Sequence, residues 1–253
     1  MTTLATLFAP AQRQRLLAAI PKRYSCRSFS AAPAPADWAS LSYAAQRYAL
    51  PGARLILRSV SPDIFTGIVL GVGKITGCTT AAVVVTSLGE PHGRVNVGIL
   101  GEAFCLEATA LGLGTCWVSG TYKRKLLDLP LQPDEAVLAV IALGVPAKSD
   151  PPENRRRKSL SRLCKGDLSL WPQEFRQAAV AVQAAPSAMN LQPWEMLLED
   201  GSLALTVPLR QSLDLGIAAC HAELALSHPH QWAFADGAAL CTPAGVSLKE
   251  IIP

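Results

Sequence analysis

The sequence predicts an α+β fold with a central, largely antiparallel sheet flanked by helices. Half of the 253 residues are hydrophobic, which is enough for a sizeable core. Helix-like and strand-like segments alternate along the chain with short connections between them. The order helix, strand, strand, long helix, strand, strand occurs twice. We therefore expect a duplicated architecture, with one half in residues 1–150 and the other in residues 151–253.

Hydrophobic periodicity and breaker residues define the elements of the first half. The dipeptide Pro51-Gly52 marks the end of a predicted helix. The continuous β-branched run at 81–87 has the composition of a buried strand. The expected elements are helix 36–50, strand 53–60, strand 81–87, helix 94–111, strand 112–120, helix 123–129 and strand 136–144.

The second half begins after a segment rich in Pro and charge, residues 146–158, which has the composition of a linker. The dipeptide Asp200-Gly201 between two apolar runs is a hairpin signal. The expected elements are helix 172–185, strands 194–200 and 203–208, helix 211–227, and strands 231–236 and 238–242 with a turn at Gly237.

Composition excludes several classes of protein. Lys and Arg number 23 against 19 Asp and Glu, and a net charge of +4 does not imply a nucleic-acid or membrane partner. No apolar run approaches the roughly 18 residues of a membrane span. The seven cysteines form no C-x-x-C pair, which argues against a structural metal site and favours a reducing cytoplasm. The N-terminal segment has the pattern of a short amphipathic helix rather than a signal peptide.

The stretch RYSCRSF at 23–29 is the first candidate for a functional site. Arg23, Ser25 and Arg27 alternate, so in an extended segment their side chains would face the same way. Two guanidinium groups and a hydroxyl on one face suit a phosphate, because Arg offers it permanently charged, bidentate hydrogen bonds. The alternative interpretation is a solvated basic strand.

The stretch APSAMNLQPW at 185–194 is the second candidate. Its prolines fix the backbone, while Ser187, Asn190 and Gln192 supply hydrogen-bonding side chains. Such a loop could hold a planar ligand with polar edges. The alternative is an ordinary helix end followed by a turn. In both interpretations Trp194 is expected in the core.

Taken together, the two stretches resemble the signature elements R-x-S-x-R-x-F and A-P-S-A-x-N-x-Q-P-W of the nitroreductase family of FMN-dependent oxidoreductases. Residues 107–122 are similar to the family's long helix, its GLG turn and the loop beside the flavin. Residues 155–163 are similar to a basic segment that reaches the flavin phosphate. The resemblance implies a nitroreductase-like fold, with NAD(P)H as the electron donor. The implied acceptor is a small molecule such as a nitroaromatic or a quinone.

The resemblance also implies which residues contact FMN, with no dedicated catalytic acid or base and no metal ligand. Residues 23–29, here called the arm, would hold the phosphate and the ribityl chain. One Arg of the cluster at 155–157 would add to the phosphate site. Backbone groups after the GLG turn would lie beside the flavin ring. The 185–194 loop would contact the ribityl chain or the ring edge. The implied contacts are Arg23, Tyr24, Ser25, Arg27, Ser119, Gly120, Arg155, Arg157, Pro186, Ser187 and Asn190.

The chain departs from the usual family pattern in the position of its second motif. In family members the PSAxNxQPW element follows the arm by a single helix, but here residues 48–57 occupy that place without Ser or Asn. Family homodimers bind FMN between subunits, with the arm from one and the loop from the other. The chain therefore resembles a subset with a duplicated fold, in which one chain mimics the homodimer. This implies one flavin site per chain and a monomer.

Two alternatives to this function stay open. One is another reaction of the same fold, such as reductive dehalogenation or flavin fragmentation. The other is a flavin-binding or cofactor-free protein with an interaction role, which the loss of the motif from the first half would favour.

Overall fold

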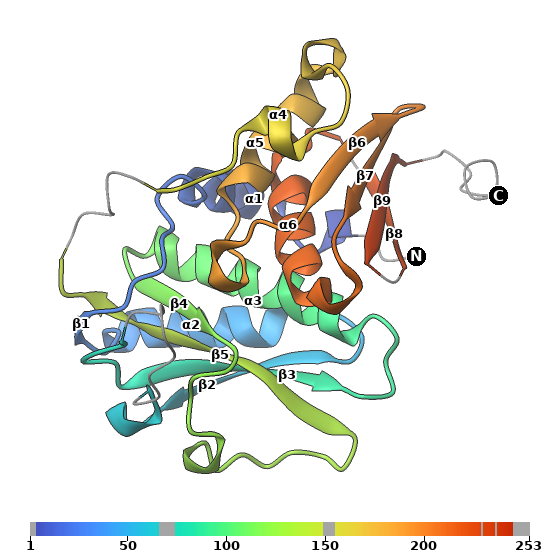
Figure 1. Ribbon diagram of the computed structural model, residues 1–253. Coiled ribbons are helices and arrows are strands. Elements are labelled where there is room, and N and C mark those ends of the chain that lie inside the picture. The colour runs from blue at the N-terminus through green and yellow to red at the C-terminus, as the bar shows by residue number, and fades with distance from the viewer. Residues whose placement is uncertain (1–3, 66–73, 149–154, 229, 236, 245–253) are drawn as a thin grey trace. The chain divides into compact units, whose positions relative to one another are not determined.

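The computed structural model describes residues 4–65, 74–148, 155–228, 230–235 and 237–244 (Figure 1). The chain divides into two compact units, residues 18–155 and residues 1–17 together with 156–253, and each is described by itself. The expected boundary between residues 150 and 151, and residues 149–154 of the expected linker, lie outside the described residues. The grouping of the first 17 residues with the C-terminal unit is a feature that the sequence pattern does not reveal.

The unit of residues 18–155 is a helix-covered antiparallel sheet. Its elements are β1 (Phe29–Ala31), α2 (Pro35–Arg47), β2 (Ala53–Ser59), β3 (Thr80–Ser87), α3 (Gly93–Ala110), β4 (Gly114–Val118) and β5 (Glu135–Pro146). The helix expected over 123–129 is only a 3₁₀ turn, Arg124–Leu126. Asp128 follows it with a left-handed φ of 40°, a conformation that an α-helix cannot accommodate.

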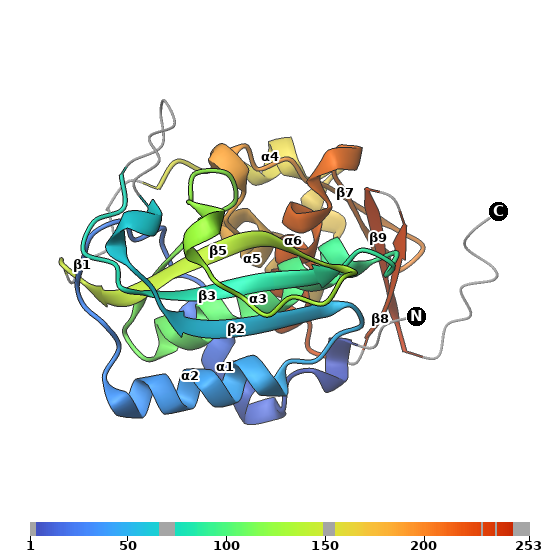
Figure 2. The ribbon, with the colours of Figure 1, turned by 90° about the horizontal axis from the view of Figure 1, so that it is seen from below.

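The sheet of this unit is built around β3 and β5. β2 pairs with β3 and β3 pairs with β5, while β4 and β1 pair with the other edge of β5, all antiparallel. α2 and α3 pack against the sheet and against each other (Figures 1 and 2). Alternate residues of β3, including Val83 and Val85, point into an apolar cluster that also contains Phe29, Phe65 and Leu127.

The other unit carries a smaller antiparallel sheet. Its elements are α1 (Pro10–Ala19, whose last two residues belong to the other unit), α4 (Leu160–Leu163), α5 (Gln173–Ala184), β6 (Glu195–Glu199), β7 (Ser202–Thr206), α6 (Ser212–Ala225), β8 (His230–Ala235) and β9 (Ala238–Pro243). Asp200 and Gly201 both have positive φ, 47° and 73°, and form the expected hairpin turn between β6 and β7. α6 packs against α5 and the sheet.

The two units share one topology. Each runs helix, strand, strand, helix, strand, strand: α2-β2-β3-α3-β4-β5 in one and α5-β6-β7-α6-β8-β9 in the other. The strand orders β2-β3-β5-β4 and β6-β7-β9-β8 also correspond. The predicted α+β class and the repeated order of elements are therefore confirmed, while descent from a fused dimer stays a prediction.

Two further expectations concern the environment of the chain. Within the part of the chain that the structure describes, no helix combines the length and apolar character needed to cross a bilayer. All seven cysteines are free thiols and all are buried.

Candidate functional site

The arm, residues 23–29, forms two isolated bridges before β1 begins at Phe29, one to Thr115 of β4 and one to Thr76. Ser25 bridges to Thr115 in the parallel sense. The Cys26 amide donates both to the Thr115 carbonyl at 2.9 Å and to the Tyr24 carbonyl at 3.0 Å. The second bond closes a tight turn centred on Ser25, which interrupts the alternation of an extended segment.

The side chains of the arm differ in exposure. Arg23 is buried, with 2% of its surface exposed, Ser25 is half-buried and Arg27 is exposed. The prediction that all three face the same way stays a prediction, and only Ser25 and Arg27 are accessible. The hydroxyl of Tyr24 donates to the Lys148 carbonyl at 3.4 Å, and both residues belong to the unit of residues 18–155. Arg27, whose guanidinium makes a long 3.4 Å contact to the Ser25 carbonyl, is the most accessible cation of the arm.

Arg23 lies in a buried cationic cluster. Its Nε is 3.5 Å from Oε1 of the fully buried Glu102, which also accepts the indole N–H of Trp117 at 2.9 Å. Within the described residues, Nε and Nη1 of Arg23 have no hydrogen-bond partner. Arg155 donates to the carbonyls of Arg23 and Pro21, both at 2.6 Å. Desolvation, followed by the charge of Arg23, lowers the pKa of Arg155. The guanidinium of Arg155 therefore contacts the backbone of the arm and is close enough to Arg23 for the two charges to interact.

The GLG turn brings the arm and β4 into close contact. Gly112 has a φ of +80°, which opens the turn from α3 into β4. A Cβ at Gly114 would lie 2.7 Å from Cβ of Cys26, so the arm can cross here only over a glycine. Ser119 and Gly120 follow β4 and are exposed, which leaves their backbone groups accessible.

Gly114→Ala is expected to destabilise the protein by about 1–3 kcal/mol and to weaken any ligand held by the arm, because the new methyl group displaces Cys26. Gly89→Ala is the control, since a Cβ there meets nothing within 4 Å and Gly89 is not a predicted ligand contact. Thermal unfolding of the two variants checks this prediction. Equal melting temperatures for both would show that the arm does not depend on the crossing at Gly114.

The second candidate loop follows α5 and has an unusual backbone. Met189, Asn190 and Gln192 have φ values of 52°, 55° and 48°. Non-glycine residues in this left-handed region cost free energy, and they persist where surrounding contacts hold them. Such backbone strain is concentrated at functional sites, which supports the interpretation of this segment as a ligand loop rather than an ordinary turn.

Gln192 stabilises this loop through hydrogen bonds of its side chain and of its backbone. Its side chain is buried, with 4% exposed, and its Oε1 accepts the Lys158 amide at 2.7 Å. The backbone amide of Gln192 donates to the Ser187 hydroxyl at 2.8 Å. Trp194 has 1% of its surface exposed, which confirms its expected place in the core.

Arg157 and Asn190 are joined by a hydrogen bond. Arg157 donates to Oδ1 of Asn190 at 2.6 Å and to the Ala184 carbonyl at 2.9 Å, while Asn190 donates to the Arg156 carbonyl at 3.0 Å. The basic segment is thus divided: Arg155 contacts the backbone of the arm and Arg157 contacts the loop. Both guanidinium groups serve positioning contacts, whereas the resemblance implies a phosphate contact for one of them.

A carboxylate at the start of α6 completes the loop's support. Asp214 is buried, with 3% exposed, and accepts the Ala188 amide at 3.1 Å. Burial raises the pKa of the Asp214 carboxyl to about 6, although the hydrogen bond from Ala188 lowers it. A carboxyl that titrates this close to neutrality is a common feature of functional sites.

The sequence pattern predicts no role for Glu102, Lys158 or Asp214, and it predicts Gln192 only as a hydrogen-bonding side chain of a ligand loop. Gln192 lies inside the recognised motif, so its internal role could have been considered. Glu102 and Asp214 are isolated acids in apolar helices, and an acid in such a place must find a partner when buried. That pattern was the available signal.

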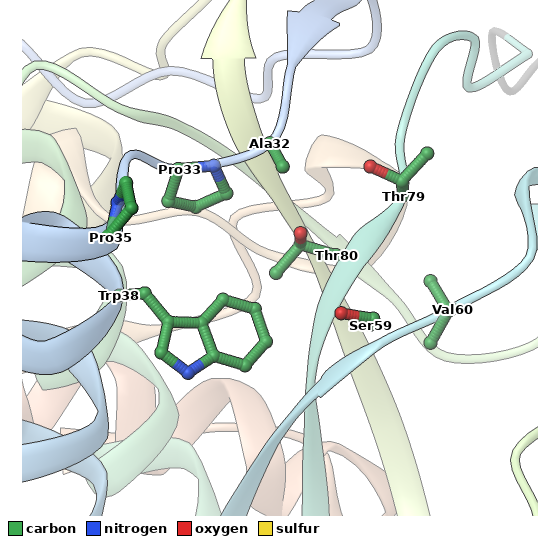
Figure 3. Close-up of a pocket in the computed structure, with 8 residues that line it drawn as sticks. All are labelled: Ala32, Pro33, Pro35, Trp38, Ser59, Val60, Thr79 and Thr80. Carbon is green, nitrogen blue, oxygen red and sulfur yellow. The ribbon is translucent and has the colours of Figure 1, made fainter.

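A separate pocket lies in the unit of residues 18–155, between the start of α2 and the ends of β2 and β3 that meet there (Figure 3). Its volume is about 540 Å³, and none of the predicted flavin contacts lines it. The indole of Trp38 and the hydroxyls of Ser59, Thr79 and Thr80 form much of the wall. The lining contains no charged side chain, so the pocket does not suit a phosphate.

The fold and the two motif segments define a protein of the nitroreductase type. Residues 15–226 match the family described as "Putative TM nitroreductase", and the chain belongs to this family. The predicted family is therefore confirmed. No curated protein matches the chain at a significant level.

Solved structures with a similar fold include three nitroreductase-type proteins. A putative nitroreductase from Thermotoga maritima MSB8 has a TM-score of 0.64 and 22% identity, over 90% of this chain and 93% of that chain. An FMN-dependent nitroreductase from Clostridium difficile R20291 has a TM-score of 0.44 and 15% identity, over 54% of this chain and 90% of that chain. A nitroreductase with bound FMN from Desulfitobacterium hafniense DCB-2 has a TM-score of 0.42 and 18% identity, over 56% and 94%. At these identities the likeness concerns the fold.

Proposed function

We propose that the protein is an FMN-dependent oxidoreductase that takes electrons from NAD(P)H and passes them to a nitroaromatic, a quinone or a similar small molecule. The observation that carries this proposal is the cationic arm. Arg27 is exposed, and Arg23 of the same segment adds a second, buried positive charge that is paired with Glu102. An exposed guanidinium in a positive environment suits the phosphate of FMN.

The residues present fit the cofactor in complementary ways. Arg27 and Ser25 would hold the phosphate, and the charges of the buried Arg23 and the half-buried Arg155 would strengthen the positive potential there. Pro186, Ser187 and Asn190 would border the ribityl chain or the ring, and Ser119 and Gly120 would offer backbone groups. FMN, when bound, supplies the two-electron redox chemistry. The chain's own contribution is position and charge, and no side chain is assigned a proton-transfer role.

The same proposal includes a single flavin site per chain in a cytoplasmic monomer. The arm motif occurs in the first half and the loop motif in the second. The corresponding topologies of the two units support descent from a duplicated fold that replaces the family homodimer. Under this proposal each half contributes the motif that the other lacks.

The visible spectrum of the purified protein tests the proposal. After FMN is added and excess is removed by desalting, the protein should retain the absorption of bound flavin. Anaerobic addition of NADH or NADPH should bleach it, and a nitroaromatic or quinone should restore it. Failure to retain flavin at micromolar protein would reject the proposal.

A non-catalytic flavin-binding or interaction protein is the second candidate. The observation in its favour is that Arg155 and Arg157 donate to backbone and loop acceptors, so they serve the fold directly. Flavin that is retained but not bleached by either NADH or NADPH would favour this candidate.

A further inference from the structure

The central helices of the two units share a short pattern near their N-termini. α3 contains NVGI at 96–99, and α6 contains DLGI at 214–217. The two helices hold the same place in the repeated topology. Asn96 and Asp214 therefore occupy corresponding positions, and both are buried, with 1% and 3% of their surfaces exposed.

Asn96 contacts the loop that leads into β2, and Asp214 contacts the loop that leads into β6, but with opposite polarity. Asn96 donates through Nδ2 to the Pro51 carbonyl at 2.8 Å. Asp214 accepts the Ala188 amide at 3.1 Å. An amide side chain thus faces a loop carbonyl in one half, and a carboxylate faces a loop N–H in the other. The shorter loop, 48–52, lacks the motif, whereas the loop at 186–192 carries it.

The Ala188 contact controls the strained part of the loop. Ala188 begins the 3₁₀ turn, in which Asn190 donates to the Ser187 carbonyl and Leu191 donates to the Ala188 carbonyl, both at 3.0 Å. Holding the Ala188 amide therefore fixes the entry to the left-handed residues. A carboxylate is well suited to this task, because it makes a charge-assisted bond and also lies in the first turn of α6, where the helix dipole favours negative charge.

We infer that Asp214 is the positioning residue of the 186–192 loop, and that the change from amide to acid at this matched position distinguishes the half with a ligand loop from the half without one. The effect on flavin rests on the proposed function, whereas the effect on the loop does not. Asp214 acts through the backbone of Ala188 and not by touching the cofactor.

Asp214→Ala is expected to weaken FMN binding by about 10-fold or more, the effect of losing one hydrogen bond to a charged group. The amides of Ala188, Asn190 and Leu191 should lose protection from hydrogen exchange. Asp214→Asn should give an intermediate result, with a smaller loss of affinity and of protection than Asp214→Ala, because its Oδ1 can still accept the bond but without the negative charge. Affinity and protection equal to those of the wild type in Asp214→Asn would overturn the role assigned to the acid. FMN titration and amide exchange by NMR measure the two effects.

Ala188→Pro removes the donor while leaving Asp214 in place, and it serves if Asp214→Ala does not fold. Ser187 has φ −146° and ψ 162°, a conformation compatible with a following proline, which is also favourable at the first position of a helical turn. The double variant should bind FMN no more weakly than the weaker single variant. If the losses in FMN binding free energy of the two single variants add up in the double variant, the two residues act independently, which would overturn the inference.

Asn96→Ala is the matched control, and it should leave both FMN affinity and the exchange of the 186–192 loop unchanged. Unchanged protection of Asn190 and Leu191 in Asp214→Ala, or unchanged FMN affinity, would overturn the inference. If the wild-type protein takes up no FMN, the proposed function fails. The exchange measurements alone then decide the positioning role.

Discussion

Replacing Arg27 by alanine is expected to weaken FMN binding by about 10- to 100-fold without lowering the stability of the apo protein. Arg27 is the exposed cation of the arm, and a charge-assisted bond to phosphate contributes on the order of 1.5–3 kcal/mol. Its recorded contact within the unit is a long one, so little of the fold depends on it. Fluorescence titration with FMN measures the affinity, and thermal unfolding of the apo protein measures stability.

Arg47→Ala is the control for Arg27→Ala. Arg47 is exposed in the last turn of α2, so its removal makes the same change in net charge within the same unit. Its affinity for FMN should equal that of the wild-type protein. If Arg27→Ala instead lowers the melting temperature of the apo protein and leaves affinity unchanged, the residue has a structural role and the phosphate contact is wrong.

Replacing Glu102 by alanine is expected to lower the free energy of unfolding by about 3–5 kcal/mol. Glu102 is fully buried, and its removal would leave the guanidinium of Arg23 buried without a countercharge and the indole of Trp117 without an acceptor. Urea unfolding followed by circular dichroism measures the loss.

Glu135→Ala provides the comparison for Glu102→Ala. Glu135 pairs with Arg54 at 2.6 Å, but the side chains have 13% and 41% of their surfaces exposed. The pair is bidentate but Arg54 is accessible to solvent, so it contributes about 1 kcal/mol, and the surface variant should lose much less stability than Glu102→Ala despite its shorter contact. Similar small losses for both variants would mean that Arg23 does not depend on Glu102. Arg23 would then be free for the phosphate, as the resemblance implies.

Much of the fold follows from local sequence signals. The β-branched run predicted as strand 81–87 is β3, Thr80–Ser87, and Asp200-Gly201 forms the predicted turn. These elements depend on residues that are close together in the sequence. Arg13 instead pairs with Glu223, a contact between α1 and α6 that helps to place the first 17 residues in the C-terminal unit. No local pattern reveals a partner so distant along the chain.

The candidate site shows the same limit. The motifs identified the arm and the loop, but the burial of Arg23 depends on Glu102, a partner 79 residues away in the sequence. The alternation of side chains along a segment predicts a shared face but not how deeply each side chain is buried. Likewise, the bond between Arg157 and Asn190 joins segments separated by a whole helix, so the sequence could suggest that both were polar but not that they pair.

The stoichiometry of bound FMN, measured together with the mass of the protein in solution, tests most directly whether one chain carries one complete site. Titration of the apo protein, followed by absorbance and by light scattering on the same sample, gives both quantities. One FMN per chain in a monomer is the predicted result. Two FMN per chain, or one FMN shared by two chains, would contradict the single-site proposal.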